Sequence, residues 1–133
     1  MLSDQTDAVC AFSLKGYKTD AKVVKVYDGD TIHVVFHYFD KFYKWTCRIS
    51  HVDTPELRTK DLEEKKKGYE ARDKLRELIF EKTVQLTCQD FDKYGRLLVE
   101  IEIEGVKVDE WLIQNGYAKK YEGGTKEKWS SSP

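Results

Sequence analysis

The stretch AKVVKVYDGDTIHVVFHYF, residues 21–39, carries the clearest structural signal in the chain. Apolar and polar residues alternate in its second half, which places Ile32 and Val34 on one face of an extended strand. Between the two halves, the pair Asp28-Gly29 is a strong signal for a tight hairpin turn. The stretch therefore predicts two antiparallel strands, with a second carboxylate directly after the turn that joins them.

The rest of the chain continues with strand and helix patterns in turn. The expected elements are strands over 21–27, 31–39 and 42–49, a charged surface loop over 57–68, a helix over 69–80, strands over 83–89 and 97–105, and a short helix over 107–116. Their order is three strands, a helix, two strands and a helix. This content predicts an α+β domain, namely a five-stranded OB-fold Greek-key β-barrel with two or three packed helices.

Length and charge indicate one compact domain without a global electrostatic field. The chain has 133 residues, 40% of them hydrophobic, and its 23 basic and 24 acidic residues give a formal net charge of −1. Any site for an anion must therefore be local. We expect an N-terminal extension over 1–16 that is partly ordered, the folded domain over 17–122 and a flexible tail over 123–133.

The termini and the cysteines bear on the cellular setting. Asp4 and Asp7 stand where a secretion signal needs positive charge, and no stretch is apolar enough to span a membrane. The three cysteines lack a C-x-x-C spacing, which argues against a disulfide framework and against a zinc site. We expect free thiols in an intracellular protein that is a monomer and does not associate with membranes.

Register arithmetic brings distant residues together at one end of the expected sheet. If the second and third strands join at a turn near Phe39 and Asp40, paired residue numbers sum to about 78 to 80. Asp30 then lies opposite Arg48 or Ile49. In a flat sheet, side-chain alternation would separate Asp30 from Arg48, so their convergence requires strand coiling at a barrel rim or a bulge.

Further carboxylates follow in the segment VDTPE, where Asp53 and Glu56 emerge at the same rim as Asp30. Gathered carboxylates repel and raise one another's pKa unless a cation lies between them. Oxygen ligands without a nearby His or Cys pair favour Ca²⁺ or Mg²⁺ over zinc, and a backbone carbonyl suits the flexible coordination of Ca²⁺. Arg48 lies beside this expected site. A structural calcium site has no need of a further positive charge, so the arginine indicates that a phosphate is bound there.

Each motif also has a purely structural interpretation. Asp28-Gly29 alone is an ordinary turn, and VDTPE alone can be a strand exit followed by a helix cap. DKYGR, residues 92–96, is by itself a common hairpin turn with an exposed arginine. The lysine run 65–67 can be a solvated face or a contact for substrate. The joint occurrence of these motifs favours a functional interpretation.

Three motifs together resemble one known family. DGDT, the arginine of CRISHVDTPE, and DKYGR occur in this order, with a helix between the last two, as in the thermonuclease (staphylococcal nuclease-like) family. The resemblance covers residues 21–118. It implies an OB barrel with packed helices and a Ca²⁺-dependent nuclease that hydrolyses DNA and RNA, single strands preferred, by metal-assisted attack of water, leaving 3′-phosphate and 5′-hydroxyl ends.

The resemblance also implies a role for individual residues by position. The implied roles are Ca²⁺ binding for Asp30, Asp53 and the backbone carbonyl of Thr54, with Asp28 in support. Glu56 is implied as the general base or as the group that positions the attacking water. Phosphate binding and catalysis are implied for Arg48 and Arg96, and substrate binding for Lys93, Tyr94 and Tyr121. The assignment of Tyr121 is by proximity, because the family carries its tyrosine before a further C-terminal helix and residues 121–129 form a poor helix.

Two other functions remain open from the residues alone. The staphylococcal type is strongly basic whereas this chain is nearly neutral, which suits a non-catalytic OB-fold module that binds nucleic acid or a protein partner. A structural calcium module is the third possibility. Neither of them needs an intact set of two arginines, two metal carboxylates and Glu56, so the set favours the nuclease.

Overall fold

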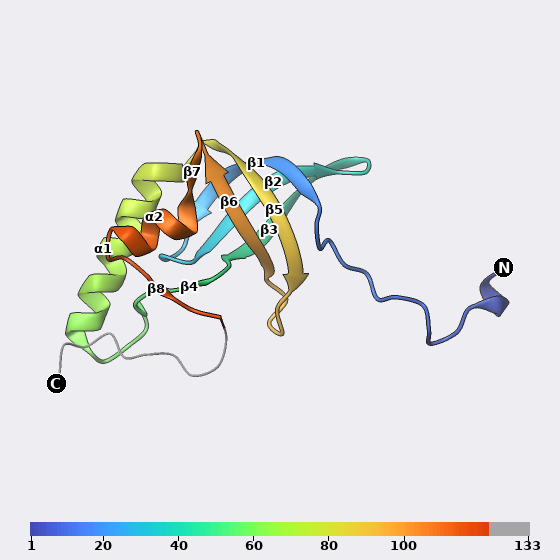
Figure 1. Cartoon of the computed structure of the whole chain (residues 1–133), viewed down its shortest axis with the longest axis horizontal. Helices are drawn as coiled ribbons and strands as arrows, with labels where there is room; N and C mark the ends of the chain where they lie inside the picture. Colours follow the sequence, from blue (N-terminus) through green and yellow to red (C-terminus); the bar gives the residue numbers. More distant parts are fainter. Residues whose placement is uncertain (123–133) are drawn as a thin grey trace.

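Five strands close into a barrel in the computed structural model, which describes residues 1–122. Its strands are β1 (Lys18–Val26), β2 (Thr31–Tyr38), β3 (Lys41–Ile49), β5 (Thr83–Phe91) and β6 (Leu97–Ile103). They run in the order β3-β2-β1-β5-β6, and β6 pairs back onto β3 in parallel, which closes the sheet (Figure 1). The predicted α+β barrel of the OB type is confirmed.

The predicted register between β2 and β3 is confirmed. Thr31 pairs with Arg48, and Tyr38 pairs with Lys41, so the connecting turn consists of Phe39 and Asp40. In the turn between β1 and β2, the Asp28 carboxylate accepts hydrogen bonds from the backbone N–H groups of Asp30 and Thr31, at 3.0 and 2.8 Å. The side chain of the first motif residue thus fixes the shape of its own turn.

Helix α1 (Leu62–Ile79) begins before the predicted start at Tyr69, so the prediction of a surface loop was wrong for residues 62–68. The Asp61 carboxylate caps the helix by accepting from the N–H groups of Glu63 and Glu64. Gly68, which resembled a loop residue, is buried inside the helix. A Cβ atom there would lie 2.8 Å from Leu57 Cδ2, so glycine permits the close approach of the preceding segment.

The remaining elements are short. They are the 3₁₀ helix η1 (Leu2–Asp4), the helix α2 (Val108–Gln114) and the strands β4 (Val52–Asp53), β7 (Val106–Lys107) and β8 (Lys119–Lys120). The predicted short helix is confirmed as α2, which ends before Gly116 at φ +77°. β4 pairs antiparallel with β8, so the segment after the barrel returns to the VDTPE motif. Figure 1 shows both α helices on the same side of the barrel.

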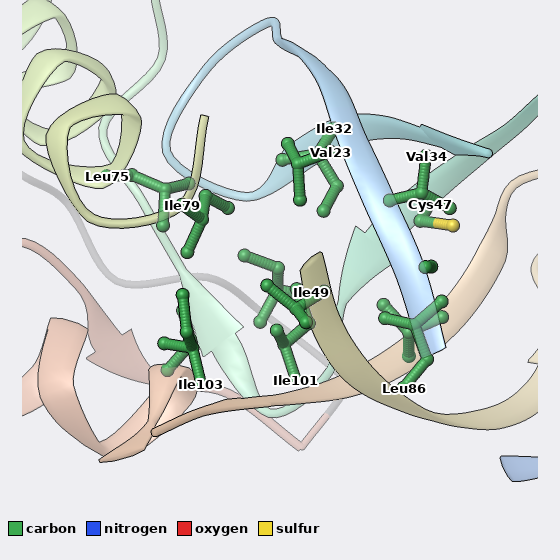
Figure 2. Close-up of a cluster of buried hydrophobic side chains, with 14 of the residues drawn as sticks. Val23, Ile32, Val34, Cys47, Ile49, Leu75, Ile79, Leu86, Ile101 and Ile103 are labelled. Carbon is green, nitrogen blue, oxygen red and sulfur yellow. The ribbon is translucent and has the colours of Figure 1, made fainter. Parts of the chain in front are cut away.

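One hydrophobic core fills the barrel and extends beneath α1. Figure 2 shows Leu75 and Ile79 of α1 facing the side chains of the strands, among them Ile32, Ile49 and Ile101. The thiols of Cys47 and Cys88 are fully buried in this core, and burial raises their pKa to about 12 and about 11, respectively.

Two further findings concern the cysteines and the helices. The cysteines within residues 1–122 are free, as expected. Within the same residues, no helix is long and apolar enough to cross a membrane. The expected flexible tail over 123–133 lies outside the described residues.

Candidate active site

Asp30 and Arg48 meet at the rim of the barrel, although strict alternation would separate them. Arg48 Nη2 lies 3.5 Å from Asp30 Oδ2, and both residues are only 8% exposed. Asp30 precedes Thr31, the first residue of β2, so the alternation of the strand does not apply to it. Its backbone carbonyl nevertheless accepts a hydrogen bond of 2.8 Å from Ile49 N–H, which holds Asp30 against β3.

Main-chain carbonyls hold the guanidinium of Arg48 in place. Arg48 Nη1 donates to the carbonyl of Ile49 at 3.1 Å, and Nη2 donates to the carbonyl of Val52 at 2.9 Å. The fixed fork of a guanidinium can satisfy both acceptors and still face a carboxylate. Arg48 is therefore a preorganised positive charge at the rim.

Arg96 reaches the same rim from the turn between β5 and β6. Its Nε donates to Asp92 Oδ2 at 2.7 Å, and its Nη1 donates to Thr31 Oγ1 at 3.4 Å. The hydroxyl of Thr31 in turn donates to Asp30 Oδ1 at 3.1 Å. A chain of polar contacts therefore joins the two arginines through Thr31 and Asp30.

The pKa of Asp92 is lowered by its interactions with Arg96. Partial burial raises this pKa, but hydrogen bonds from the backbone and side chain of Arg96, and a further one from the backbone of Tyr94, outweigh the burial and lower it. The carboxylate of Asp92 is therefore ionised and orients the guanidinium.

The two acidic segments of the rim touch each other. A Cβ atom on Gly29 would lie 2.9 Å from Thr54 Cβ, so the turn 28–30 packs directly on the VDTPE segment. Asp53 and Thr54 are buried there, at 4% and 3% exposure. Burial, and secondly the charge of Asp30, raise the pKa of Asp28 to about 7. The rim is thus a buried acidic environment that favours binding of a cation or a proton.

The donor set suits a hard divalent cation. Within residues 1–122, no group of three or more His, Cys, Asp or Glu side chains is placed to hold a metal by itself. Three oxygen donors lie on the two segments that touch at the rim, namely the carboxylates of Asp30 and Asp53 and the backbone carbonyl of Thr54, the ligand candidates from the sequence. Such a set fits Ca²⁺, which accepts carbonyl oxygens, water and substrate oxygens as further ligands.

A groove of about 470 Å³, which we call the rim groove, adjoins this acidic centre. Its lining includes Arg48, Arg96, Lys93, Tyr94 and Tyr121, the five phosphate- and substrate-binding candidates from the sequence. The ring centroid of Tyr121 lies 5.8 Å from Arg48 Cζ, and that of Tyr94 lies 5.5 Å from Arg96 Cζ. The groove therefore combines two guanidiniums with two aromatic rings.

Glu56 lines a second cavity of about 340 Å³, the Glu56 cavity, which shares Arg96 with the rim groove. Asp28 and Thr31 also line this cavity, so it joins Glu56 to the acidic turn and to one of the two arginines. The Glu56 N–H donates to Glu64 Oε2 of α1 at 2.9 Å, which ties the VDTPE segment to the first turn of the helix. Glu56 itself is exposed.

The structure adds two residues that the sequence reasoning missed. Thr31 connects Arg96 to Asp30, and its only signal was its place in the DGDT motif. Arg58 lines the Glu56 cavity and is exposed, and nothing in the charged segment around it distinguished it from its neighbours.

Comparisons with known proteins identify relatives of this chain. The family model described as "Staphylococcal nuclease homologue" matches residues 46–131. An uncharacterized endonuclease of Escherichia coli is 33% identical over 104 residues, which cover 76% of this chain and 60% of that protein. Endonuclease YncB of Bacillus subtilis is 35% identical over 105 residues, which cover 74% of this chain and 48% of that protein.

A third relative, an uncharacterized protein of Bacillus anthracis, is 35% identical over 108 residues, with 78% of this chain and 49% of the relative covered. The chain thus spans about half to three fifths of the length of these three relatives.

Proposed function

The chain belongs to the staphylococcal nuclease homologue family, and from this premise we propose that it is a Ca²⁺-dependent nuclease that hydrolyses phosphodiester bonds of DNA, RNA or both. The observation that carries the proposal is the chain of contacts from Arg48 through Asp30 and Thr31 to Arg96. It fixes two positive groups at one acidic rim, where a phosphate and a divalent cation can be bound together.

In this proposal the residues of the rim divide the chemistry between them. Asp30, Asp53 and the carbonyl of Thr54 hold Ca²⁺, which when bound supplies positive charge to the phosphate oxygens and helps to orient the attacking water. Arg48 and Arg96 donate to the equatorial oxygens, whose negative charge grows toward the transition state. Lys93, Tyr94 and Tyr121 bind the nucleotide in the rim groove.

Glu56 acts as the general base. It accepts a proton from a water molecule while the water oxygen forms a bond to phosphorus. The bond between phosphorus and the 5′ oxygen breaks, and the leaving oxygen takes a proton from solvent. The products therefore end in a 3′-phosphate and a 5′-hydroxyl. A groove open to solvent favours single strands, whose backbone can bend toward the rim.

Cleavage of a fluorescent single-stranded DNA tests the proposal. We expect cleavage with millimolar Ca²⁺ and none in EGTA, with product masses that correspond to 3′-phosphate ends. Cleavage of an RNA strand of the same sequence, measured in parallel, gives the preference between ribose and deoxyribose. Absence of cleavage with Ca²⁺, or equal cleavage in EGTA, contradicts the proposal and leaves the non-catalytic binding module as the alternative.

A further inference from the structure

A third concave surface lies beside the Glu56 cavity and has no role in the chemistry described above. This helix groove, of about 480 Å³, runs between α1, the end of β1 and the segment after Glu56. Five of its lining residues are basic, and none of those that the structure describes is acidic; the basic ones are Lys25, Arg58, Lys65, Arg72 and Arg76. This excess is notable in a chain whose formal net charge is −1.

The helix groove is continuous with the proposed active site. Tyr27, Leu57 and Arg58 line both the helix groove and the Glu56 cavity. A chain molecule that leaves the Glu56 cavity past Arg58 therefore enters the helix groove directly.

The spacing of residues on α1 explains why its basic side chains share this face. Lys65, Tyr69, Arg72 and Arg76 follow one another at intervals of four, three and four residues, which forms one stripe along a helix. The buried stripe of the same helix, which includes Ala71 and Leu75, lies beside it and fixes the rotation of the helix against the barrel. From residue 65 to residue 76 the stripe extends about 16 Å at 1.5 Å per residue.

Among residues 1–122, the charges of the stripe are only partly offset. Arg72 Nη2 lies 3.0 Å from Asp73 Oδ1, which does not line the groove, and Arg72 Cζ lies 4.7 Å from the ring centroid of Tyr69. Lys25 Nζ lies 5.9 Å from the ring centroid of Tyr27. Tyr27 and Tyr69 are 39% and 40% exposed, so the groove also has aromatic surface on both walls.

We propose that the helix groove binds the sugar-phosphate backbone of the substrate strand beyond the scissile phosphate. This inference rests on the proposed function and assigns to it a polymeric substrate rather than a short nucleotide. Basic side chains interspersed with exposed aromatic rings are the combination by which proteins hold single strands without reading their sequence. A concave groove that leads from the active site suits a strand better than a flat anionic membrane.

The test replaces the basic stripe of the helix by neutral helix-forming residues, as Lys65→Gln, Arg72→Gln and Arg76→Gln together. The control carries the same loss of charge on other exposed surfaces, as Lys15→Gln, Lys44→Gln and Lys107→Gln. Fluorescence anisotropy measures binding of a labelled single strand of about 16 nucleotides, the upper end of the site size of one OB fold. The measurement is made in EGTA over a series of salt concentrations, so it does not depend on hydrolysis.

The proposal predicts that the slope of log K against log salt decreases in magnitude by about 2 in the stripe variant, at about 0.7 for each lost phosphate contact. In the control, the slope changes from the parental value by less than half of this amount. With Ca²⁺, the ratio of kcat/KM for the long strand to kcat/KM for a dinucleotide decreases in the stripe variant. Circular dichroism confirms the fold, and Lys25→Gln with Arg76→Gln gives a milder variant, with a change in slope of about 1.4.

Equal slopes in the stripe variant and the control overturn the inference. A stripe variant that loses binding to phosphatidylserine vesicles but binds the oligonucleotide as the parent does also overturns it. Failure of the proposed function has a different signature. In that case no form cleaves any strand with Ca²⁺, yet the change in slope in EGTA is still observed and the helix groove remains a strand-binding surface.

Discussion

The proposed active site has two halves that differ in how the protein holds them. In the buried half, Asp30, Arg48 and Asp53 lie at the closed rim of the barrel and are 4–8% exposed. In the open half, Glu56 and Lys93 are exposed, and Tyr94 is 72% exposed. In the proposed mechanism, residues of the buried half would contribute to both folding and chemistry, whereas those of the open half would contribute to chemistry alone. Substitutions should therefore separate stability from activity in one half and not in the other.

Glu56→Gln is expected to have the largest effect on the rate and to show this separation most clearly. Loss of a general base lowers turnover by about 10²- to 10⁴-fold. The side chain is exposed, so the free energy of unfolding should change by less than about 0.5 kcal/mol. Single-turnover cleavage and urea unfolding measure the two effects. The exposed Glu70→Gln on α1 is the matched control, and an unchanged rate in Glu56→Gln would remove Glu56 from the mechanism.

Arg48→Lys tests the opposite expectation for the buried half. A lysine cannot keep the hydrogen bonds to the carbonyls of Ile49 and Val52 together, so we expect a loss of about 1–3 kcal/mol in the free energy of unfolding. Turnover should also decrease, by about 10²- to 10³-fold.

Arg96→Lys is the matched comparison, because the side chain of Arg96 is 29% exposed against 10% for Arg48. We expect a similar loss of rate and a smaller loss of stability for Arg96→Lys. Equal losses of stability in the two variants would contradict the division into two halves.

Gly29→Ala strains the contact between the two acidic segments. The new Cβ would lie 2.9 Å from Thr54 Cβ and 3.1 Å from Ala71 Cβ, so the turn or the VDTPE segment must shift. We expect a loss of about 1–3 kcal/mol in stability, together with weaker Ca²⁺ binding by calorimetry.

Gly16→Ala is the control for this substitution, because nothing lies within 4 Å of its Cβ position. Its φ of +88° makes the substitution destabilising by about 1–2 kcal/mol from backbone strain alone. Ca²⁺ affinity should stay at the parental value. A Gly29→Ala variant that also keeps parental affinity would show that the close packing of the rim is irrelevant to the metal site.

Asp92→Asn should have the smallest effect, and one that depends on pH. The folded-state pKa of Asp92 lies below its ordinary value of 3.8, because the hydrogen bonds from Arg96 outweigh the effect of burial. Its ionised form therefore stabilises the fold above pH 3.8, and this contribution is lost as the pH falls through the folded-state pKa.

We expect Asp92→Asn to lack this contribution, about 1 kcal/mol, at pH 6 and to approach the parental protein in stability as the pH falls through the folded-state pKa of Asp92. Urea unfolding at a series of pH values measures it, with the exposed Asp20→Asn as control. An Asp92→Asn variant as stable as the parent at pH 6 would show that the carboxylate does not hold Arg96.

Register and motif order made the barrel and the buried half predictable from the sequence. The tight turn at Phe39 and Asp40 fixed the pairing of β2 with β3, and that pairing placed Asp30 next to Ile49. Alternation was misleading for Asp30, because this residue lies in the turn and not in the strand. Gly68 was misleading in another way. The sequence predicts it at the end of a loop, whereas it lies within α1, where the lack of a side chain allows Leu57 to pack closely.

The open half and the helix groove could not be predicted in the same way. Glu56 and Arg58 lie on a segment whose path depends on packing against α1, and no periodicity of the segment encodes that path. The basic stripe of α1 has helical spacing in the sequence, but its position beside Tyr27 depends on how the helix rotates against the barrel.

A crystal soaked with Ca²⁺ and a nucleoside 3′,5′-bisphosphate is the decisive test of the proposed site. Anomalous scattering locates the ion, which we expect to bind Asp30, Asp53 and the carbonyl of Thr54, with one phosphate contacting both Arg48 and Arg96. An ion bound elsewhere, or a phosphate that contacts neither arginine, would contradict the proposal.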